Sequence, residues 1–226
     1  MIANIFTQKL DNSQLSKVIE VSTKLNINPN WLLAVIYFET AKTFNPSKTN
    51  SIGSVGLIQF TRDKAGVNYK TINGKRYLLS DIGKMNFVKQ MDLVYEYYKE
   101  VLQITKQPIS SFVETYLTTF FPNALGKEDN YIFQTKGLSS SLIAKQNPIF
   151  DLNKDGKITK IEVENSFKKW YGDTFTIINT KKKNDIMNKT KQFFTENKRV
   201  IHAILISIAV GLGIYYYAKN KKNGKL

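Results

Sequence analysis

An uncharged, apolar run close to the carboxyl end of the chain constrains its folding more than any other feature. The 19 residues from Val200 to Ala218 contain no Lys, Arg, Asp or Glu, and a helix of this length spans the roughly 30 Å of hydrocarbon in a bilayer. Tyr215, Tyr216 and Tyr217 stand at one end, where an interfacial aromatic belt would lie. The pattern predicts a single transmembrane helix over 199–218 with a basic tail at 219–226. A buried core helix is the alternative interpretation.

The residues before this run divide into two parts by composition. Residues 1–172 have the mixed composition of a globular domain, and 173–198 form a polar, Lys-rich linker. The start of the chain lacks the basic and then apolar pattern of a signal peptide. With no cysteine and a single histidine, His202, the chain excludes disulfides, thiolate metal sites and a cysteine nucleophile, and disfavours a histidine triad.

Positive charge predicts an anionic partner without choosing among the candidates. The chain has 33 Lys and Arg against 18 Asp and Glu, a net charge of +15. Such a surface attracts nucleic acid, anionic lipid or acidic cell-wall polymers. No nucleic-acid recognition motif accompanies the charge, so a nucleic-acid-binding membrane protein is the least favoured hypothesis.

The globular part is expected to be mainly helical, with one small β-hairpin. Apolar residues at helical spacing, together with capping residues, predict helices after Asn12 and Ser13, from Pro29 to about Glu39, over about 84–103 and over about 110–120. Asn73-Gly74 separates two strand-like segments, 69–72 and 75–79. An Asn-Gly pair in this setting favours a two-residue type I′ turn.

Three short patterns between Phe38 and Phe60 carry the chemistry. They are Glu39-Thr40, Phe44-Asn45-Pro46 and the loop Gly53-Ser54-Val55-Gly56-Leu57-Ile58-Gln59. In their order and spacing the chain resembles the soluble lytic transglycosylases, which have a goose-type lysozyme-like fold, and it looks closest to their phage-borne branch. Thr40 stands where that family usually has serine and Ser54 where it has alanine, and the family's later Tyr-Asn block is not visible.

The resemblance implies an α+β lysozyme-like fold and an enzyme that cleaves peptidoglycan glycan strands. Glu39 would be the catalytic acid, with Ser54, Gln59, Phe60 and Tyr116 as substrate-binding residues. Lytic transglycosylases use one glutamate first as acid and then as base toward the substrate's own 6-hydroxyl, which leaves a 1,6-anhydro-muramyl end. A lysozyme-type hydrolase is the close alternative.

The physical chemistry of Glu39 agrees with the role of an acid. A proton donor to a glycosidic oxygen must keep its proton near neutral pH, and a carboxyl at the end of an apolar helix is desolvated, which raises its pKa. Lysozyme's acid, in a different protein, has a pKa of about 6. The alternative makes Glu39 a capping or surface residue. Most glycosidases use a second carboxylate, and only Asp63 and Asp81 are near in sequence.

Glycine positions in the motif admit two interpretations that can coexist. Gly53 and Gly56 would let the backbone approach a sugar closely, with Gln59 hydrogen-bonded to the substrate beside the acid. They would also suit a tight turn that enters a helix.

A second motif predicts a calcium site. Residues 151–162, DLNKDGKITKIE, match the EF-hand loop, with ligands expected from Asp151, Asn153, Asp155, the Lys157 carbonyl and Glu162. Ile158 is expected to face the core. Pro148 precedes the loop, so a regular entering helix is not expected, while 161–170 should form the exiting helix. A structural Ca²⁺ is favoured over a switch, and an empty Asp-rich turn is the alternative.

Together these features predict a membrane-anchored lytic transglycosylase. The enzyme domain precedes the anchor without an export signal, which favours a virion protein in the internal membrane of a phage, acting on the host wall at the start of infection. A lysis enzyme at the host cell membrane is the other possibility. Partners are then peptidoglycan, the lipid membrane, and capsid or other virion proteins. The main alternative is a non-catalytic structural or glycan-binding virion protein that kept the fold.

Overall fold

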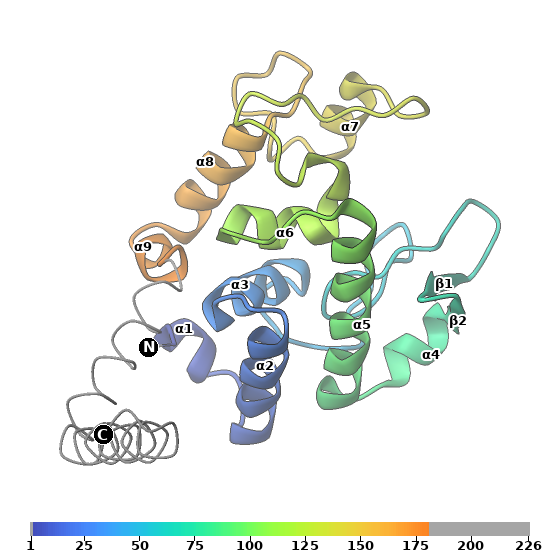
Figure 1. The fold of residues 1–226 in the computed structure, drawn as a ribbon, viewed down its shortest axis with the longest axis vertical. Helices are drawn as coiled ribbons and strands as arrows, with labels where there is room; N and C mark the ends of the chain where they lie inside the picture. Colours follow the sequence, from blue (N-terminus) through green and yellow to red (C-terminus); the bar gives the residue numbers. More distant parts are fainter. Residues whose placement is uncertain (1, 181–226) are drawn as a thin grey trace, which may run out of the picture. The chain divides into compact units, whose positions relative to one another are not determined.

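The computed structural model describes residues 2–180 (Figure 1). The predicted transmembrane helix over 199–218, the basic tail and most of the predicted linker lie outside these residues. Within residues 2–180, no helix has the length and apolar character that crossing a bilayer requires.

The described part of the chain is mainly helical and contains one two-stranded antiparallel sheet. Its elements are α1 (Asn4–Thr7), α2 (Asn12–Lys24), α3 (Pro29–Glu39), β1 (Tyr69–Ile72), β2 (Lys75–Leu78), α4 (Leu79–Lys84), α5 (Phe87–Thr105), α6 (Phe112–Phe120), the 3₁₀ helix η1 (Pro122–Ala124), α7 (Ser140–Gln146), α8 (Lys160–Tyr171) and α9 (Thr174–Ile178). The mainly helical class and the single hairpin predicted from sequence are confirmed.

Helix α3 forms the centre of the domain. It begins where expected, because the Asn28 side chain accepts a hydrogen bond from the Asn30 amide (2.9 Å) and Pro29 fills the first turn. Every residue from Asn30 to Tyr37 is buried, as expected for a helix that is apolar on all sides. Helices α2, α6 and α9 pack around it (Figure 1), so the end of α3 is held from several directions.

The hairpin forms at the predicted position and is attached to α5. Asn73 and Gly74 have φ of 48° and 75°, the left-handed pair that a type I′ turn requires. Strand β1 pairs with β2 in the register Lys70↔Tyr77 and Ile72↔Lys75. The Asn73 amide donates to Glu100 Oε1 (3.0 Å) and the Asn73 side chain to Glu96 Oε2 (2.7 Å). These bonds fix the turn of the hairpin against the side of α5.

The compact domain extends beyond the boundary expected at residue 172. Helix α9 follows α8 directly, and its Phe175 and Ile178 are buried in the same core. The Asn28 side chain also donates to the Thr180 carbonyl (2.8 Å). The described residues 2–180 therefore form one compact unit, and 173–180, the start of the predicted linker at 173–198, are part of it. Sequence composition concealed this, because two buried apolar side chains do not alter the polar character of the segment.

Candidate active site

Glu39 is the last residue of α3 and is followed by an unusual turn. The Thr40 hydroxyl donates to the Ile36 carbonyl (2.7 Å) and accepts from the Phe44 amide (2.9 Å). Ala41, Lys42 and Phe44 all have positive φ, between 50° and 68°. That region costs a residue other than glycine about 1 to 3 kcal/mol and tends to occur at functional sites. The Thr40 hydroxyl therefore holds the strained turn.

The carboxyl of Glu39 is set up to stay protonated at neutral pH. As a whole residue Glu39 is partly exposed, but its carboxyl lies among protein atoms. Burial raises the pKa of Glu39 from 4.5 to about 8, and a hydrogen bond with Tyr116 opposes this with a smaller lowering. At pH 7 most molecules therefore have a neutral Glu39, which can give a proton to a neighbouring oxygen. The direction of the shift is the one expected from the sequence.

Tyr116 lies directly against the carboxyl of Glu39. It stands in the middle of α6, is only 2% exposed, and its hydroxyl hydrogen-bonds to Glu39. Burial, first of all, and the negative charge of Glu39 raise the pKa of Tyr116 well above its usual value, so this phenol stays a hydrogen-bond donor. The residue that the resemblance singled out for substrate binding is thus a partner of the acid.

Aromatic rings from three helices form the wall around Glu39. Phe38, from α3, makes edge-to-face contacts with Tyr116 from α6 (5.7 Å between ring centres) and with Phe167 from α8 (4.9 Å). Trp170 lies 5.3 Å from the Phe38 ring. The Tyr171 hydroxyl donates to the Ala34 carbonyl (2.7 Å) and so fastens the end of α8 to α3. Phe38 is thus enclosed by rings from α6 and α8, and one of these rings, Tyr116, also reaches the Glu39 carboxyl.

The glycine-containing loop is held beside this wall by one buried glutamine. Gln90 accepts from the Leu57 amide and donates to the carbonyls of Pro46 (2.9 Å) and Ile82 (2.8 Å). Gly56 has φ of 95°, and a Cβ there would lie 2.5 Å from Gln90 Oε1. With Gln90 in this position, only a residue without a side chain fits at 56. Through its bonds to Pro46 and Leu57, Gln90 also joins the Asn-Pro turn to the glycine loop.

Sequence reasoning missed Gln90, although a signal existed. Gln90 falls on the apolar stripe of α5 with Phe87, Met91 and Val94, and a polar residue on such a stripe needs buried partners.

The alternative interpretation of the glycine loop, a tight turn that enters a helix, is right about the turn and wrong about the helix. The chain turns after Gly56 and returns through a bridge between Val55 and Phe60, and no helix lies between Phe60 and β1.

A cavity of about 350 Å³ lies between this loop, the hairpin, the middle of α5 and the end of α6. Its lining contains both apolar and polar groups: Ile58, Gln59, Phe60, Thr61, Lys70, Tyr97, Thr119, Phe120 and Pro122. Two lining residues contact the tyrosines around Glu39. Phe120 stacks on Tyr116 (5.4 Å), and Thr119 exchanges a hydrogen bond with the Tyr98 hydroxyl (2.9 Å). Tyr98 in turn lies close enough to Glu39 for the charge of that carboxylate to raise the pKa of Tyr98.

The structure brings two of the four predicted sugar-contacting residues to this cavity. Gln59 and Phe60 line the cavity. The Gln59 amide nitrogen donates to the carbonyls of Lys48 and Gly56 (both 3.0 Å), which uses its two protons on the loop and leaves the side-chain oxygen as an acceptor. Ser54 is 1% exposed and its hydroxyl pairs with that of Thr61 (2.8 Å). Ser54 therefore supports the loop from inside and is not among the lining residues.

The two aspartates considered as a second carboxylate have other partners. Asp63 accepts from the Thr71 amide (3.0 Å) and pairs with Lys70 (3.4 Å). Asp81 lies on the surface of α4 beside Lys84 (3.8 Å). The pKa of Glu39 is set by its burial and by its hydrogen bond with Tyr116, and neither aspartate contributes.

The loop from Asp151 to Glu162 has the backbone that its motif predicts. Gly156 has φ of 78°, and Ile158 is fully buried as expected. Oxygens of Asp151, Asn153 and Asp155 accept hydrogen bonds from amides within the loop, between 2.9 and 3.1 Å. Helix α8 follows, and α7 ends at Gln146, before Pro148. Across residues 2–180, no three Asp, Glu, His or Cys side chains already form a metal-ready cluster.

Glu162, at the last ligand position, supplies the test of whether a cation fits. One oxygen, Oε2, accepts from the Thr159 amide (2.9 Å) and hydroxyl (2.7 Å) in a capping box. The other, Oε1, is buried and has no hydrogen-bond partner, in a residue that is 8% exposed. A buried carboxylate oxygen without a partner is costly. The donors present, carboxylates, an amide and a carbonyl, are those that Ca²⁺ prefers, so the residues fit the ion.

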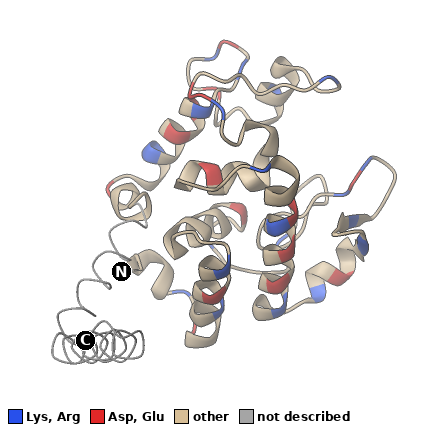
Figure 2. Ribbon diagram, in the orientation of Figure 1, with Lys and Arg blue, Asp and Glu red and all other residues tan. Residues whose placement is uncertain are grey.

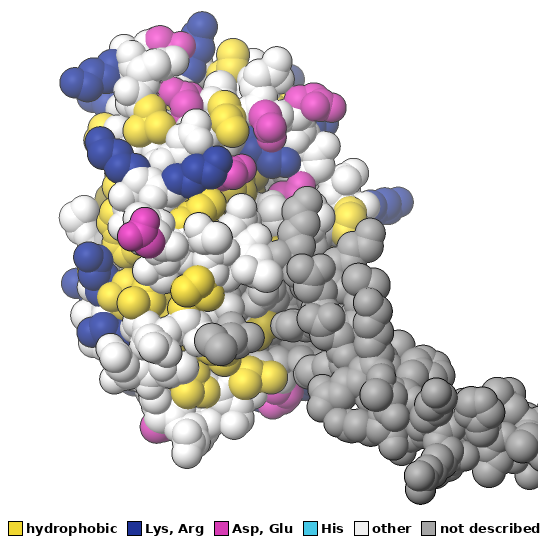
Figure 3. All heavy atoms as spheres, turned by 90° about the vertical axis from the view of Figure 1, so that its left-hand side faces the viewer, with side chains coloured by type: hydrophobic (Ala, Val, Ile, Leu, Met, Phe, Trp, Pro, Cys, Tyr) yellow, Lys and Arg dark blue, Asp and Glu magenta, His cyan; other side chains and the backbone are white. Residues whose placement is uncertain are grey.

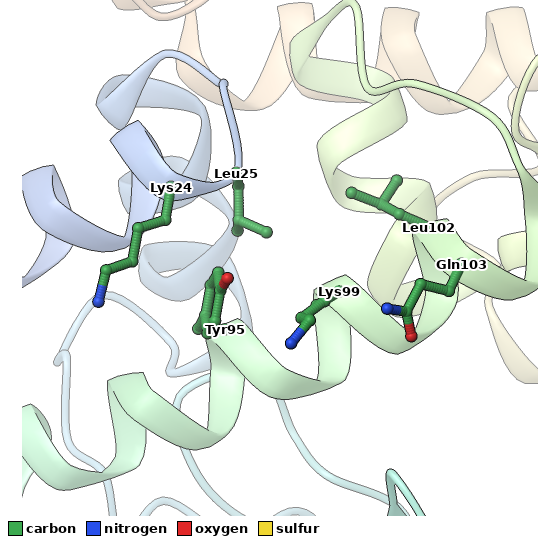
Figure 4. Close-up of a pocket in the computed structure, with 6 residues that line it drawn as sticks. All are labelled: Lys24, Leu25, Tyr95, Lys99, Leu102 and Gln103. Atoms are coloured by element: carbon green, nitrogen blue, oxygen red, sulfur yellow. The ribbon is translucent and has the colours of Figure 1, made fainter.

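A further cavity of about 260 Å³ lies between α2 and α5, away from the motif (Figure 4). Tyr95 stands there with Lys24 and Lys99 on either side, at 5.6 and 5.8 Å from its ring centre to each Nζ. None of the glycine-loop residues lines it.

Charge on the described domain is mixed. Lys and Arg alternate with Asp and Glu along α2, α5 and α8 (Figure 2). On the face drawn in Figure 3, basic, acidic and apolar side chains are interspersed. That face is unlike the continuous basic stripe that nucleic-acid binding uses.

Compared with known proteins, the chain matches no family model, no curated protein and no solved structure.

Proposed function

We propose that the protein is a peptidoglycan lytic transglycosylase with Glu39 as its catalytic group. The observation that supports this most is the neutral carboxyl of Glu39, whose pKa is raised to about 8, at the end of a central helix. Its partner Tyr116 stacks on Phe120, which lines a polar and aromatic cavity. Transfer of a proton to a leaving oxygen needs an acid that is still protonated at the working pH. The three sequence patterns around Glu39 supply the substrate class, since they resemble those of enzymes that act on glycan strands.

In the proposed first step, Glu39 protonates the glycosidic oxygen between N-acetylmuramic acid and N-acetylglucosamine. The bond from the muramyl C1 to that oxygen breaks, and positive charge develops on the sugar while Glu39 becomes a carboxylate. The Tyr116 hydroxyl stabilises this carboxylate through its hydrogen bond. Gln59 and Phe60 from the loop and Tyr97 from α5 line the cavity and contact the sugars.

In the second step, the Glu39 carboxylate takes the proton of the muramyl 6-hydroxyl, whose oxygen then bonds to C1. Glu39 returns to its neutral state and the product carries a 1,6-anhydro ring. No water is consumed, and a second carboxylate is not required. Were water to take the place of the 6-hydroxyl, the same residues would give a reducing end, as in a lysozyme-type hydrolase.

The proposal is tested with the full-length protein on purified peptidoglycan. Wild type should release soluble muropeptides that mass spectrometry identifies as the anhydro form, and Glu39→Gln should release at least a hundredfold less. Products with reducing ends would assign a hydrolase. If wild type and Glu39→Gln bind glycan equally and neither cleaves it, the chain is a glycan-binding protein instead.

We also propose that 151–162 binds a structural Ca²⁺. The unpartnered Oε1 of Glu162 supports this, together with Asp151, Asn153, Asp155 and the Lys157 carbonyl at the matching positions. Because α8 carries Glu162 in its first turn and Phe167 against Phe38, the ion would hold the aromatic wall of the active site in place.

Membrane attachment through 199–218 completes the proposal. The enzyme would act from a lipid membrane, in a virion or at the host cell surface, with peptidoglycan as its substrate.

A further inference from the structure

The cavity lined by Gln59 and Phe60 contains a charged group that the cleavage reaction does not use. Among the described residues that line it, Lys70 is the one with a charge. Glycosidic cleavage of a neutral sugar chain asks nothing of an ammonium group at this place, so its presence needs an explanation in terms of the ligand.

The position of Lys70 is fixed by the hairpin. Strand β1 carries Lys70 opposite Tyr77, and the Asn73 bonds to Glu96 and Glu100 hold the hairpin against α5. The Lys70 Nζ consequently lies over the Tyr97 ring, 5.7 Å from its centre. Tyr97 makes an edge-to-face contact with Phe60 of the glycine loop (6.1 Å). The ammonium, the phenol ring and the loop thus form one continuous side of the cavity.

The ion pair with Asp63 uses only part of the donor capacity of Lys70. Its partner Asp63 lies 3.4 Å away, and both carboxylate oxygens of Asp63 already accept from the Thr71 amide (3.2 and 3.0 Å). The Lys70 side chain is 25% exposed, so its charge is available from the cavity side. An ammonium has three protons to donate, and Asp63 occupies one direction only.

We propose that Lys70 binds a carboxylate carried by the glycan strand and so selects acidic glycans over neutral ones. This rests on the proposed function and names the feature of the substrate that the same cavity recognises. Peptidoglycan carries carboxylates on its muramyl substituents, whereas chitin has the same β-1,4-linked N-acetylglucosamine backbone without them. The polar and aromatic lining contacts the sugars, and Lys70 reads their charge.

The test measures binding in the full-length Glu39→Gln protein, which cannot consume the ligand. Two probes of equal length are compared, a muropeptide tetrasaccharide with its stem peptides and chitotetraose. Adding Lys70→Met, which keeps the apolar stem over Tyr97, should weaken muropeptide binding about tenfold, as expected for loss of one partly exposed charge-assisted bond. Chitotetraose binding should change less than about twofold, because no charge is lost from that complex.

Two further variants distinguish the effect of the Lys70 charge from a general effect of substitution on the shape of the cavity. Lys75→Met removes the same charge from the same hairpin outside this cavity, where Lys75 lies over Tyr77 (5.1 Å), and should leave both affinities unchanged. Lys70→Arg should retain the preference for the muropeptide. Equal weakening of both probes by Lys70→Met, or weakening of neither, overturns the role of Lys70 alone. If the Glu39→Gln parent binds neither probe, the glycan site itself is refuted, and the role of Lys70 with it.

Discussion

At the scale of single residues, Glu39 links the chemistry of the site to the stability of the fold. Its pKa is about 8 in the folded protein against 4.5 ordinarily, so the folded form keeps a proton that the unfolded form loses. The contribution of Glu39 to stability is therefore fully present below pH 4.5 and is lost as the pH rises through 8. The burial that keeps Glu39 protonated therefore also lowers the stability of the folded protein at neutral pH.

Replacing Glu39 by Gln is accordingly expected to stabilise the protein. Gln resembles the neutral acid and can still accept the Tyr116 hydrogen bond. At pH 7 the unfolding free energy of Glu39→Gln should exceed that of wild type by up to about 3 kcal/mol, with the gap growing from pH 4.5 to 8 and constant above. Urea unfolding at several pH values measures it. A gap that does not change with pH would contradict a raised pKa.

Tyr116 is expected to tune the pH range of activity. Its hydrogen bond lowers the pKa of Glu39, so Tyr116→Phe should move the alkaline loss of activity to higher pH. Wild type should lose about tenfold per pH unit above about 8, because the acid is then ionised. Tyr116→Phe should also turn over about tenfold more slowly at pH 7, since the carboxylate formed loses a donor. Tyr95→Phe, in the other cavity (Figure 4), is the control and should match wild type in rates against pH.

At the scale of elements, helix α8 connects the loop at 151–162 to the aromatic residues that pack against Phe38. The Ile158 carbonyl accepts from the Phe133 amide (2.9 Å), and Ile161 donates to the Asp129 carbonyl (2.9 Å). The loop thus pairs with a segment of its own domain. Lys160 adds a contact to the buried Glu114 (3.2 Å). Order in the loop is therefore transmitted to the start of α8 and, through Phe167, to the wall around Glu39.

Calcium should consequently raise the thermal stability of the whole domain. A ligand at a hundred times its Kd adds about 2.7 kcal/mol, which for a domain of this size raises the Tm by about 5 to 10 °C. Glu162→Gln can keep the capping box but loses the charged ligand, and should not respond. Glu164→Gln, which removes a surface partner of Lys168 (3.0 Å), should respond as wild type does. Equal melting curves in Ca²⁺ and in EDTA would argue against the site.

The elements themselves were largely predictable because their signals are local. Asn28-Pro29 set the start of α3, Asn73-Gly74 set the hairpin, and the EF-hand spacing set the turn at Gly156. The site was less predictable, since it depends on contacts between distant segments. Gln90 lies more than thirty positions from the loop that it holds, and Lys70 reaches the cavity only because Asn73 is bonded to α5.

At the scale of the whole molecule, two regions are expected to meet a membrane in different ways. The surface lysines, through the chain's net charge of +15, would interact with anionic headgroups, an attraction that salt screens. The apolar run at 199–218 would insert into hydrocarbon, which salt does not weaken.

Flotation with liposomes separates the two contributions. The full-length protein should remain with anionic and with neutral vesicles in 1 M salt. A chain that ends at Thr180, and so keeps the bond from Asn28, should be released from anionic vesicles by that salt and should not bind neutral ones. Retention of the shortened chain in 1 M salt would place membrane attachment in the compact domain.

The bond between Asn28 and Thr180 has a mechanical consequence. Thr180, the last described residue, lies next to the first turn of α3, whereas Glu39 is the last residue of the same helix. A tether that pulls on Thr180 would load the far end of α3 and would have to peel α9 away before any strain reached Glu39. The proposed proton donor would thus stand at the end of α3 opposite the point where such a pull is applied.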